Sequence, residues 1–318
     1  MTGRVLLWVL VAGCAAWAAA RAFGLERGYP LVPLIAFTPY VAAGSLVVTL
    51  AAAAWRQRSA TVVAAVASAV LIIAVVPRVI GGELDAASPG GPSIRVATVN
   101  LDLARASVDD VVDLVRRERV DLLALQEVDA GVVRRFEAAG LDELLPERVV
   151  ALGRATHGTA MYGRMSLRTR EAPAGMWNAH AVAIAEVPGA APIEVVSVHP
   201  PAPSSRRRTR AWARDLSRLP DATPGSTVRV LAGDFNATLD HAALRRIIDT
   251  GYRDVAEQAG EGLNPTWPVG RLIPPVTIDH ILVDRRCGVG RVEIHEIERT
   301  DHRAVVAEIV LAPRAAAG

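Results

Sequence analysis

The chain has 318 residues, of which 51% are hydrophobic, and its formal net charge at neutral pH is +2. This near-neutral balance gives no general argument for nucleic-acid binding. The two cysteines, Cys14 and Cys287, provide no disulfide framework. The length allows one domain of about 200 to 230 residues together with an accessory region.

The hydrophobic excess is concentrated in the first eighty residues. Apolar runs near 5–20, 31–55 and 60–77 predict about three transmembrane helices, and the second run is longer than the ~20 residues that span a bilayer. The length and purity of these runs disfavour three buried helices of a soluble protein. The first run also fits a cleaved signal peptide, with Arg4 as its basic start.

The arginines beside these runs predict an orientation. Arg4, Arg56 and Arg58 are expected on the cytoplasmic side, against Arg21 and Arg27 outside. A retained first span and a cleaved signal peptide both leave the C-terminal part outside the cytoplasmic membrane. We therefore expect a multi-pass protein of the cell membrane with residues 1–80 in the bilayer region, a Gly/Pro-rich linker at 81–93 and an extracytoplasmic catalytic domain at 94–312.

The remainder of the chain is expected to mix helices and strands. Helices are predicted at 107–117 with Ser107 as cap, from Asp129 to 139, at 204–219, and at 240–248 with Asp240 as cap. Strands are predicted at 94–99, 122–125, 158–162, 181–187, 193–198, 228–231, 277–283, 290–297 and 303–310. Many of these strands end in polar residues, which indicates two packed sheets flanked by helices, with a site at the strand ends.

The polar residues at the strand ends are candidates for chemistry. Glu127 follows a buried strand, Asp234 and Asn236 follow another in a G-D-F-N sequence, and His199 follows a third. Taken singly, each has a structural interpretation as a solvated strand end, an Asx turn or a hydrogen-bonded loop histidine. Asparagine occurs only four times in the chain, and Asn100 is a second copy at a strand end.

The order of these clusters resembles the endonuclease/exonuclease/phosphatase superfamily, which has the DNase I-like fold. The resemblance extends from residue 94 to about 310 and implies a four-layer α/β sandwich in a membrane-anchored bacterial member. It also implies a metal-dependent phosphoric ester hydrolase of the phosphodiesterase or nuclease type. The matching residues are Asn100 with Asp102, Gln126-Glu127, Gly233-Asp234-Phe235-Asn236, Ile278-Asp279-His280 and Thr300-Asp301-His302.

The resemblance implies a metal centre and an attacking water. Phosphoester hydrolysis needs a cation to neutralise the phosphate, a positioned water and a donor for the developing charge. Glu127 and Asn100, assisted by Asp301, are expected to hold Mg²⁺, with Mn²⁺ as an alternative, because hard oxygen ligands suit these ions. Asp234 is expected to orient or deprotonate the water.

The same resemblance implies donors to the phosphate. Asn236 is expected to hold a non-bridging oxygen, while His199 and His302 donate to the phosphate or the leaving group. Asp279 is expected to fix the orientation of His302.

The substrate-binding residues are less clearly marked. His157, Tyr162 and Arg164 are candidates for a phosphate contact, and Trp267 is expected either to stack on the substrate or to pack in the core. A basic run at 206–214 is expected to form a solvated helix face or a collar for anionic headgroups or nucleic acid.

The expected partners are a phosphate-ester substrate, either nucleic acid or a phospholipid headgroup, and the lipid bilayer, with no obligate protein partner. A phosphatase of phospholipids or envelope metabolites is an alternative function. A non-catalytic binding module on the same fold is a second alternative.

Overall fold

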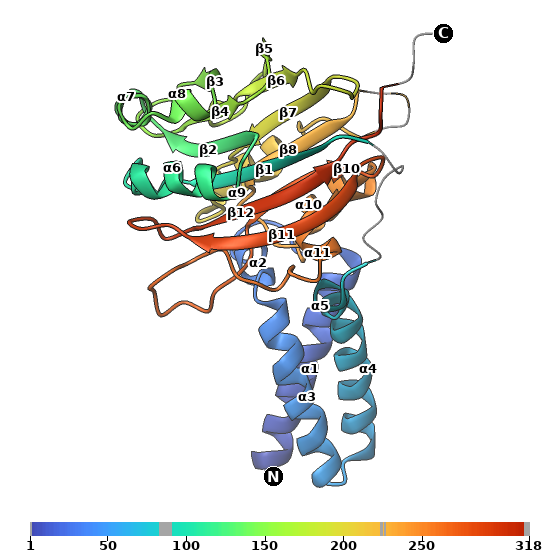
Figure 1. The fold of residues 1–318 in the computed structure, drawn as a ribbon. Coiled ribbons are helices and arrows are strands. Elements are labelled where there is room, and N and C mark those ends of the chain that lie inside the picture. Colours follow the sequence, from blue (N-terminus) through green and yellow to red (C-terminus); the bar gives the residue numbers. More distant parts are fainter. Residues whose placement is uncertain (1, 83–90, 223–224, 226, 315–318) are drawn as a thin grey trace.

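The computed structural model describes residues 2–82, 91–222, 225 and 227–314. A helical bundle at the N-terminus projects from one end of an α/β domain (Figure 1). Most of the linker expected at 81–93 lies outside the described residues.

Three long helices form the bundle, and two short helices lie at its junction with the domain. The long helices are α1 (Thr2–Phe23), α3 (Thr38–Ala54) and α4 (Arg58–Val75), and the short ones are α2 (Leu31–Ile35) and α5 (Pro77–Ile80). Small side chains allow the long helices to pack closely, while large apolar side chains point outward, with Leu50 70% and Ile73 73% exposed. A bundle surface of this kind is suited to lipid and poorly suited to water.

The expected single span over 31–55 is wrong. The chain forms the short helix α2, turns, and begins α3 at Thr38, so that α3 has only 17 residues. Pro39 explains the break, because it has no N–H to continue the preceding helix, whereas its fixed φ suits the first turn of a new one. Two helices of the described residues, Thr2–Phe23 and Arg58–Ile80, are long and apolar enough to cross a membrane, and α3 is a shorter apolar helix between them.

The α/β domain is built on two six-stranded sheets that pack face to face over an aliphatic core. The strand order of the first sheet is β11-β12-β1-β2-β4-β3, and that of the second is β5-β6-β7-β8-β10-β9. The first sheet contains β1 (Ser93–Asn100), β2 (Leu122–Val128), β3 (Glu147–Ala151), β4 (Gly158–Gly163), β11 (Gly288–Glu296) and β12 (Arg303–Val310). The second contains β5 (Leu167–Arg170), β6 (Val182–Ala185), β7 (Ile193–Val198), β8 (Arg229–Asp234), β9 (Tyr252–Asp254) and β10 (Asp279–Asp284).

Helices cover the outer faces of both sheets. The first sheet is covered by α6 (Val108–Arg117), α7 (Ala130–Ala138) and α8 (Leu141–Leu144), and the second by α9 (Arg206–Leu216) and α10 (Ala242–Asp249). A short helix, α11 (Val255–Gln258), follows β9. The expected caps Ser107 and Asp129 are confirmed, since Ser107 accepts from the amide of Asp110 and Asp129 from that of Val132. The expected cap Asp240 is wrong, because α10 begins at Ala242 and His241 precedes it. The chain therefore has the expected two-sheet α/β fold.

Strand pairing brings the polar strand ends to one edge of the sandwich. β1 and β2 are parallel, with Asn100 opposite Gln126, and β7 and β8 are also parallel, so that these four strands end near one another. β10 is antiparallel to β8 and begins with Asp279 opposite Asp234. β12 is antiparallel to β1, and the hydroxyl of Thr300, just before β12, donates to the Asn100 carbonyl at 2.9 Å. Residues that are far apart in the sequence therefore meet at this edge.

Candidate active site

A cavity of about 300 Å³ lies at the edge where the strand ends meet. Asn100 and Asp279 lie directly behind its surface, buried and hydrogen-bonded to residues that line it. The polar lining consists of Asp102, Glu127, Thr156, His157, Asn178, His199, Arg208, Asp234, Asn236, Asp301 and His302.

The backbone around Glu127 is held in an uncommon conformation. Glu127 has a φ of 60° and lies in a bulge of β2, where the pairing with β4 shifts between Gln126 and Val128. Leu103, itself at a φ of 57°, donates its amide to Oε2 of Glu127 at 2.5 Å. Non-glycine residues with positive φ are costly and concentrate at functional sites. Here the bulge turns the Glu127 carboxylate into the cavity.

Asp234 is buried at the centre of the site. Its Oδ2 accepts from Nδ2 of Asn100 at 2.9 Å and from Nδ2 of Asn236 at 3.2 Å, and its Oδ1 accepts from the Asn236 amide at 2.7 Å. Burial and the neighbouring charge of Asp279 raise the pKa of Asp234 to about 7. The preceding Gly233 is required for the approach of β7 and β8, because a Cβ there would lie 2.0 Å from the Val198 carbonyl oxygen.

His302 is held as a cation by Asp279. Its Nδ1 lies 2.9 Å from Oδ2 of Asp279, and its Nε2 lies 4.0 Å from Oδ2 of Asp234 and 3.7 Å from Oδ1 of Asp301. Burial lowers the pKa of His302, but the charge of Asp279 and its hydrogen bond outweigh this effect and raise the pKa to about 10. At neutral pH His302 therefore presents a proton on Nε2 to the cavity.

His199 has the opposite character. Its Nε2 lies 3.6 Å from Oε1 of Glu127 and 3.8 Å from Oδ2 of Asp234. On its other side it meets the amide of Asn178, which donates to the His199 carbonyl at 2.7 Å. Burial, together with the nearby charges of His180 and His302, lowers the pKa of His199 to about 3. His199 is therefore a neutral imidazole.

Asp301 is anchored from outside the cavity. Its Oδ2 accepts from the indole Nε1 of Trp267 at 3.0 Å and pairs with Arg271 at 2.7 Å. The Trp267 ring packs beside His302, with the ring centroids 6.5 Å apart. Trp267 does not line the catalytic cavity but lines an apolar groove beside it, where it packs against Val276 and Ile278, so the packing role is the one of its two expected roles that the structure supports at the cavity. It holds Asp301 in place.

The three candidates for the phosphate contact lie at different positions along β4, and only one of them reaches the cavity. His157, just before β4, lines the cavity. Arg164, just after β4, lies at the opposite end of the sheet and pairs with Asp121 at 3.1 Å, so its expected contact with the substrate is wrong. Tyr162 is buried and packs against Phe136 in the core. The physical reason is that β4 runs antiparallel to β2, so only its first residues lie near Glu127.

Asn178 and Thr156 line the cavity but were not singled out from the sequence, and Arg208 was expected only as one member of the basic run at 206–214. Asn178 contacts His199, and it is a third copy of the scarce asparagines, which is the feature that could have identified it. Arg208, within the basic run of α9, lines the cavity, and its Nε is buried without a hydrogen-bond partner among the described residues. A buried, unpartnered guanidinium nitrogen beside such a cavity is suited to an anionic ligand.

The donor set of the cavity fits a hard divalent cation. Glu127, Asp234 and Asp301 bring carboxylates to one cavity, and the Asn100 amide lies directly behind it, with Oδ1 accepting from the Asp102 amide at 3.0 Å. Carboxylate and amide oxygens are the ligands that Mg²⁺ and Mn²⁺ prefer. Burial raises the pKa of Glu127, although the Leu103 amide and His302 oppose this effect. A cation would relieve the cost of burying these charges together.

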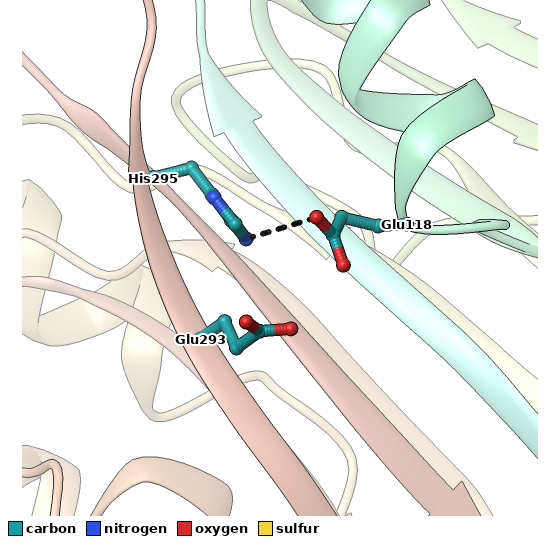
Figure 2. A group of neighbouring side chains, drawn as sticks. All are labelled: Glu118, Glu293 and His295. Atoms are coloured by element: carbon teal, nitrogen blue, oxygen red, sulfur yellow. Dashed lines mark ion pairs between the residues drawn. The ribbon is translucent and has the colours of Figure 1, made fainter.

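A second group of possible ligands lies away from the cavity. Figure 2 shows Glu118, after α6, facing Glu293 and His295 of β11, with His295 Nε2 3.8 Å from Oε1 of Glu118. The carboxylates already have cationic partners, since Arg117 lies 3.2 Å from Glu118 and Arg291 lies 2.5 Å from Glu293. No residue of this group lines the catalytic cavity.

Residues 97–302 match the sequence profile of the Endonuclease/Exonuclease/phosphatase family. The chain belongs to this family. Its members include phosphoester hydrolases, and the matched residues contain the cavity described above. A search of curated protein sequences finds no significant match.

Solved structures support the family assignment at the level of the fold. An endonuclease/exonuclease/phosphatase from Beutenbergia cavernae superposes with a TM-score of 0.58 at 18% identity, over 69% of this chain and 72% of that chain. Truncated TDP2 from Caenorhabditis elegans superposes with a TM-score of 0.53 at 18% identity, over 69% of this chain and 98% of that chain. An AP endonuclease from Archaeoglobus fulgidus gives 0.54 at 15% identity, over 67% and 98%.

Proposed function

We propose that this chain is a membrane-anchored phosphoester hydrolase that depends on a divalent metal and has an extracytoplasmic catalytic domain. The observation that carries the proposal is the meeting of Glu127, Asp234 and His302 in one cavity, although they come from three different strand ends. A carboxylate for a metal, a base for water and a cationic donor are the groups that the reaction needs.

The metal is assigned to the side of the cavity next to β1 and β2. Glu127 and Asn100 would hold Mg²⁺ or Mn²⁺, with Asp301 assisting. When bound, the ion neutralises the phosphate and lowers the cost of the developing negative charge.

Asp234 is assigned as the residue that orients the attacking water and accepts its proton. Its carboxylate lies in the cavity between Asn100 and Asn236, which hold it by hydrogen bonds in one orientation, as a positioned general base requires. Nδ2 of Asn236 is shared between Asp234, at 3.2 Å, and the carbonyl of Pro200, at 3.1 Å. Both of its protons are thereby used, so we assign Asn236 to positioning Asp234 in place of the phosphate contact expected from the sequence.

The two histidines divide the remaining work. His302, kept protonated by Asp279, donates from Nε2 to a phosphate oxygen or the leaving group. His199 is neutral and lies between Glu127 and Asp234, where it donates to a phosphate oxygen without adding charge to the site. His157 and Arg208 are assigned to substrate binding at the rim of the cavity.

The bundle supports the membrane anchor and its orientation. The start of α1 and the turn between α3 and α4 lie at the end of the bundle that is remote from the catalytic domain (Figure 1), and these segments contain Arg4, Arg56 and Arg58. Positively charged residues favour the cytoplasmic side, so the domain is assigned to the other side. The alternative of a non-catalytic module is disfavoured because the residues for metal, water and donor are all present in the cavity.

The proposal is tested with the full-length chain in detergent micelles and a panel of phosphoesters. Activity should be lost in excess chelator and restored by Mg²⁺ or Mn²⁺. Glu127→Gln should lower turnover about a hundredfold or more, because the charge stabilisation supplied by a metal is worth several kcal/mol. Glu147→Gln, an exposed carboxylate on β3, is the matched control and should retain activity. Full activity in chelator would contradict the metal assignment.

A further inference from the structure

An apolar groove of about 240 Å³ opens beside the catalytic cavity. It lies between the elbow that joins α2 to α3 and the segment of the domain that leads into β10. Its apolar walls are formed by Pro33, Ala36, Phe37, Ile273, Val276 and Ile278. Such walls offer little to a sugar or a phosphate, but they suit a hydrocarbon chain.

The groove adjoins the catalytic cavity. Ala202 and Asn236 line both of them. The Asn236 amide also contacts Asp234, the residue assigned to the attacking water. A molecule with its phosphate in the cavity would therefore have the groove directly beside it.

The rim of the groove is apolar and lies on the side of the bundle. The loop between α11 and β10 extends beside α2, at the domain end of the helices (Figure 1). In this loop Leu272 is fully exposed and Ile273 is 42% exposed, and Leu31 and Leu34 of α2 are also exposed. Exposed leucines on a loop next to lipid-suited helices are favourable at a bilayer surface and unfavourable in water.

We propose that the substrate is a membrane lipid phosphoester, with its phosphate in the catalytic cavity and part of an acyl chain in the apolar groove. This inference rests on the proposed hydrolase function. Water adds to phosphorus, one P–O bond breaks, and the departing oxygen takes up a proton. A nucleic-acid strand would leave the groove and its leucine rim without a partner, whereas a lipid can enter from the bilayer with its chain first.

The test uses phosphatidylglycerols with butanoyl, hexanoyl and octanoyl chains, below their micellar concentrations, and glycerophosphoglycerol as the compound without chains. Products are followed by phosphorus NMR for the full-length chain in detergent, and a single-stranded oligonucleotide is included. We expect kcat/KM to rise with chain length, by about fourfold for each methylene that the groove buries, which corresponds to ~0.8 kcal/mol.

A bulky residue introduced into the groove distinguishes binding of the acyl chain there from partitioning of the substrate into detergent. Ser204→Trp places an indole at an exposed position of the groove wall and should reduce the ratio of kcat/KM between octanoyl and butanoyl substrates to near one. Ser217→Trp, exposed at the other end of α9, is the matched control and should keep the ratio of the unmodified chain.

The outcomes distinguish this inference from the hydrolase function. Equal ratios in the Ser204→Trp and Ser217→Trp variants would overturn the groove assignment. A preference for the compound without chains or for the oligonucleotide would also overturn it, while leaving a phosphoester hydrolase. Failure to hydrolyse any phosphoester with metal present would instead contradict the proposed function.

Discussion

Two histidines that face the same cavity are held in opposite ionisation states, and the cause is the partner of each ring. His302 has a carboxylate, Asp279, on its Nδ1, whereas His199 has only the amide of Asn178 in that position. A buried imidazole without a counter-ion loses its proton, and one with a carboxylate keeps it. One site thereby obtains a neutral and a cationic donor from the same residue type.

Asp234 is the residue whose loss should affect turnover most directly. Asp234→Asn keeps the size of the side chain but removes the base, so we expect kcat to fall by about 10² to 10⁴, the usual contribution of a general base. Steady-state kinetics and circular dichroism of the full-length chain would measure activity and folding. Asp249→Asn, an exposed carboxylate at the end of α10, is the control. Equal turnover in the two variants would contradict the assigned base.

Arg208 should contribute to the binding of the phosphate. Its Nε is buried beside the cavity without a partner among the described residues, and a hydrogen bond to a charged group is worth about 1.5 to 3 kcal/mol. Arg208→Gln should therefore lower kcat/KM by about 10- to 100-fold, and Arg208→Lys should lower it less. Arg210→Gln, exposed on the same helix, should have little effect. A loss shared by the Arg210 variant would point to general surface charge.

A site residue is easiest to predict from the sequence when it directly follows a buried strand, because the strand then places it at the sheet edge. Glu127 and Asp234 follow buried strands, so their location at the sheet edge was predictable. Arg164 was not, because its position depends on the direction in which β4 pairs, which the sequence does not specify. The positions of Trp267 and Arg208 depend on how a loop and a helix pack against the sheets, which is a property of the tertiary structure.

At the scale of elements, the junction between the bundle and the domain depends on Asp240. The sequence predicted a helix cap, but α10 begins at Ala242 and Asp240 is fully buried. Its carboxylate accepts two hydrogen bonds from Arg78 of α5, at 2.6 and 2.8 Å, and one from Arg21 of α1 at 2.7 Å. One carboxylate thus joins the start of α10 to two helices of the N-terminal region.

Removing this carboxylate should weaken the whole junction. Asp240→Asn leaves Arg78 buried without its counter-charge, and breaking a buried pair in this way costs about 3 to 5 kcal/mol. We expect this loss in the free energy of unfolding of the full-length chain in detergent, measured with urea at neutral pH. The Asp249→Asn control should change it by less than about 0.5 kcal/mol. A similar small change for Asp240→Asn would show that the junction is not held by this pair.

The contribution of Asp240 should depend on pH in acid. Burial raises its pKa, but Arg78 and Arg21 outweigh this effect and hold the pKa below its ordinary value. A group with a lowered pKa stabilises the fold above the unfolded-state pKa of about 3.9, and this stabilisation is lost as the pH falls through the folded-state value. The difference in stability between the unmodified chain and Asp240→Asn should be constant from pH 7 to about 5 and narrow below about 4. If this difference in stability narrowed already near neutral pH, the pH dependence would belong to another titratable group.

The strongly patterned elements were predictable and the weak ones were not. The predicted strands at 193–198 and 303–310 agree with β7 and β12, because long aliphatic runs are buried in central positions. The short strands β3, β5 and β9 were missed, and each lies at or next to an edge of its sheet. An edge strand needs few buried side chains, so little in its sequence distinguishes it from a loop.

At the scale of the whole molecule, the catalytic cavity and its groove both lie at the domain end of the helical bundle. The groove opens toward the domain end of the helices, and the arginines at 56 and 58 lie at the other end. If the helices cross the bilayer, a substrate drawn from the adjacent leaflet reaches the cavity without leaving the membrane surface. The orientation of the bundle therefore decides which leaflet supplies the substrate.

We expect the catalytic domain on the extracytoplasmic side, because Arg56 and Arg58 favour the cytoplasm. Single cysteines at Glu147, on the domain, and at Gln57, in the turn before α4, can report this in a chain whose Cys14 and Cys287 are replaced by alanine. In spheroplasts, a membrane-impermeant maleimide should label the Glu147→Cys chain, whereas the Gln57→Cys chain should be labelled only after permeabilisation. The reverse pattern would place the cavity in the cytoplasm and its lipid substrate in the inner leaflet, and protection of both sites would contradict a domain exposed outside.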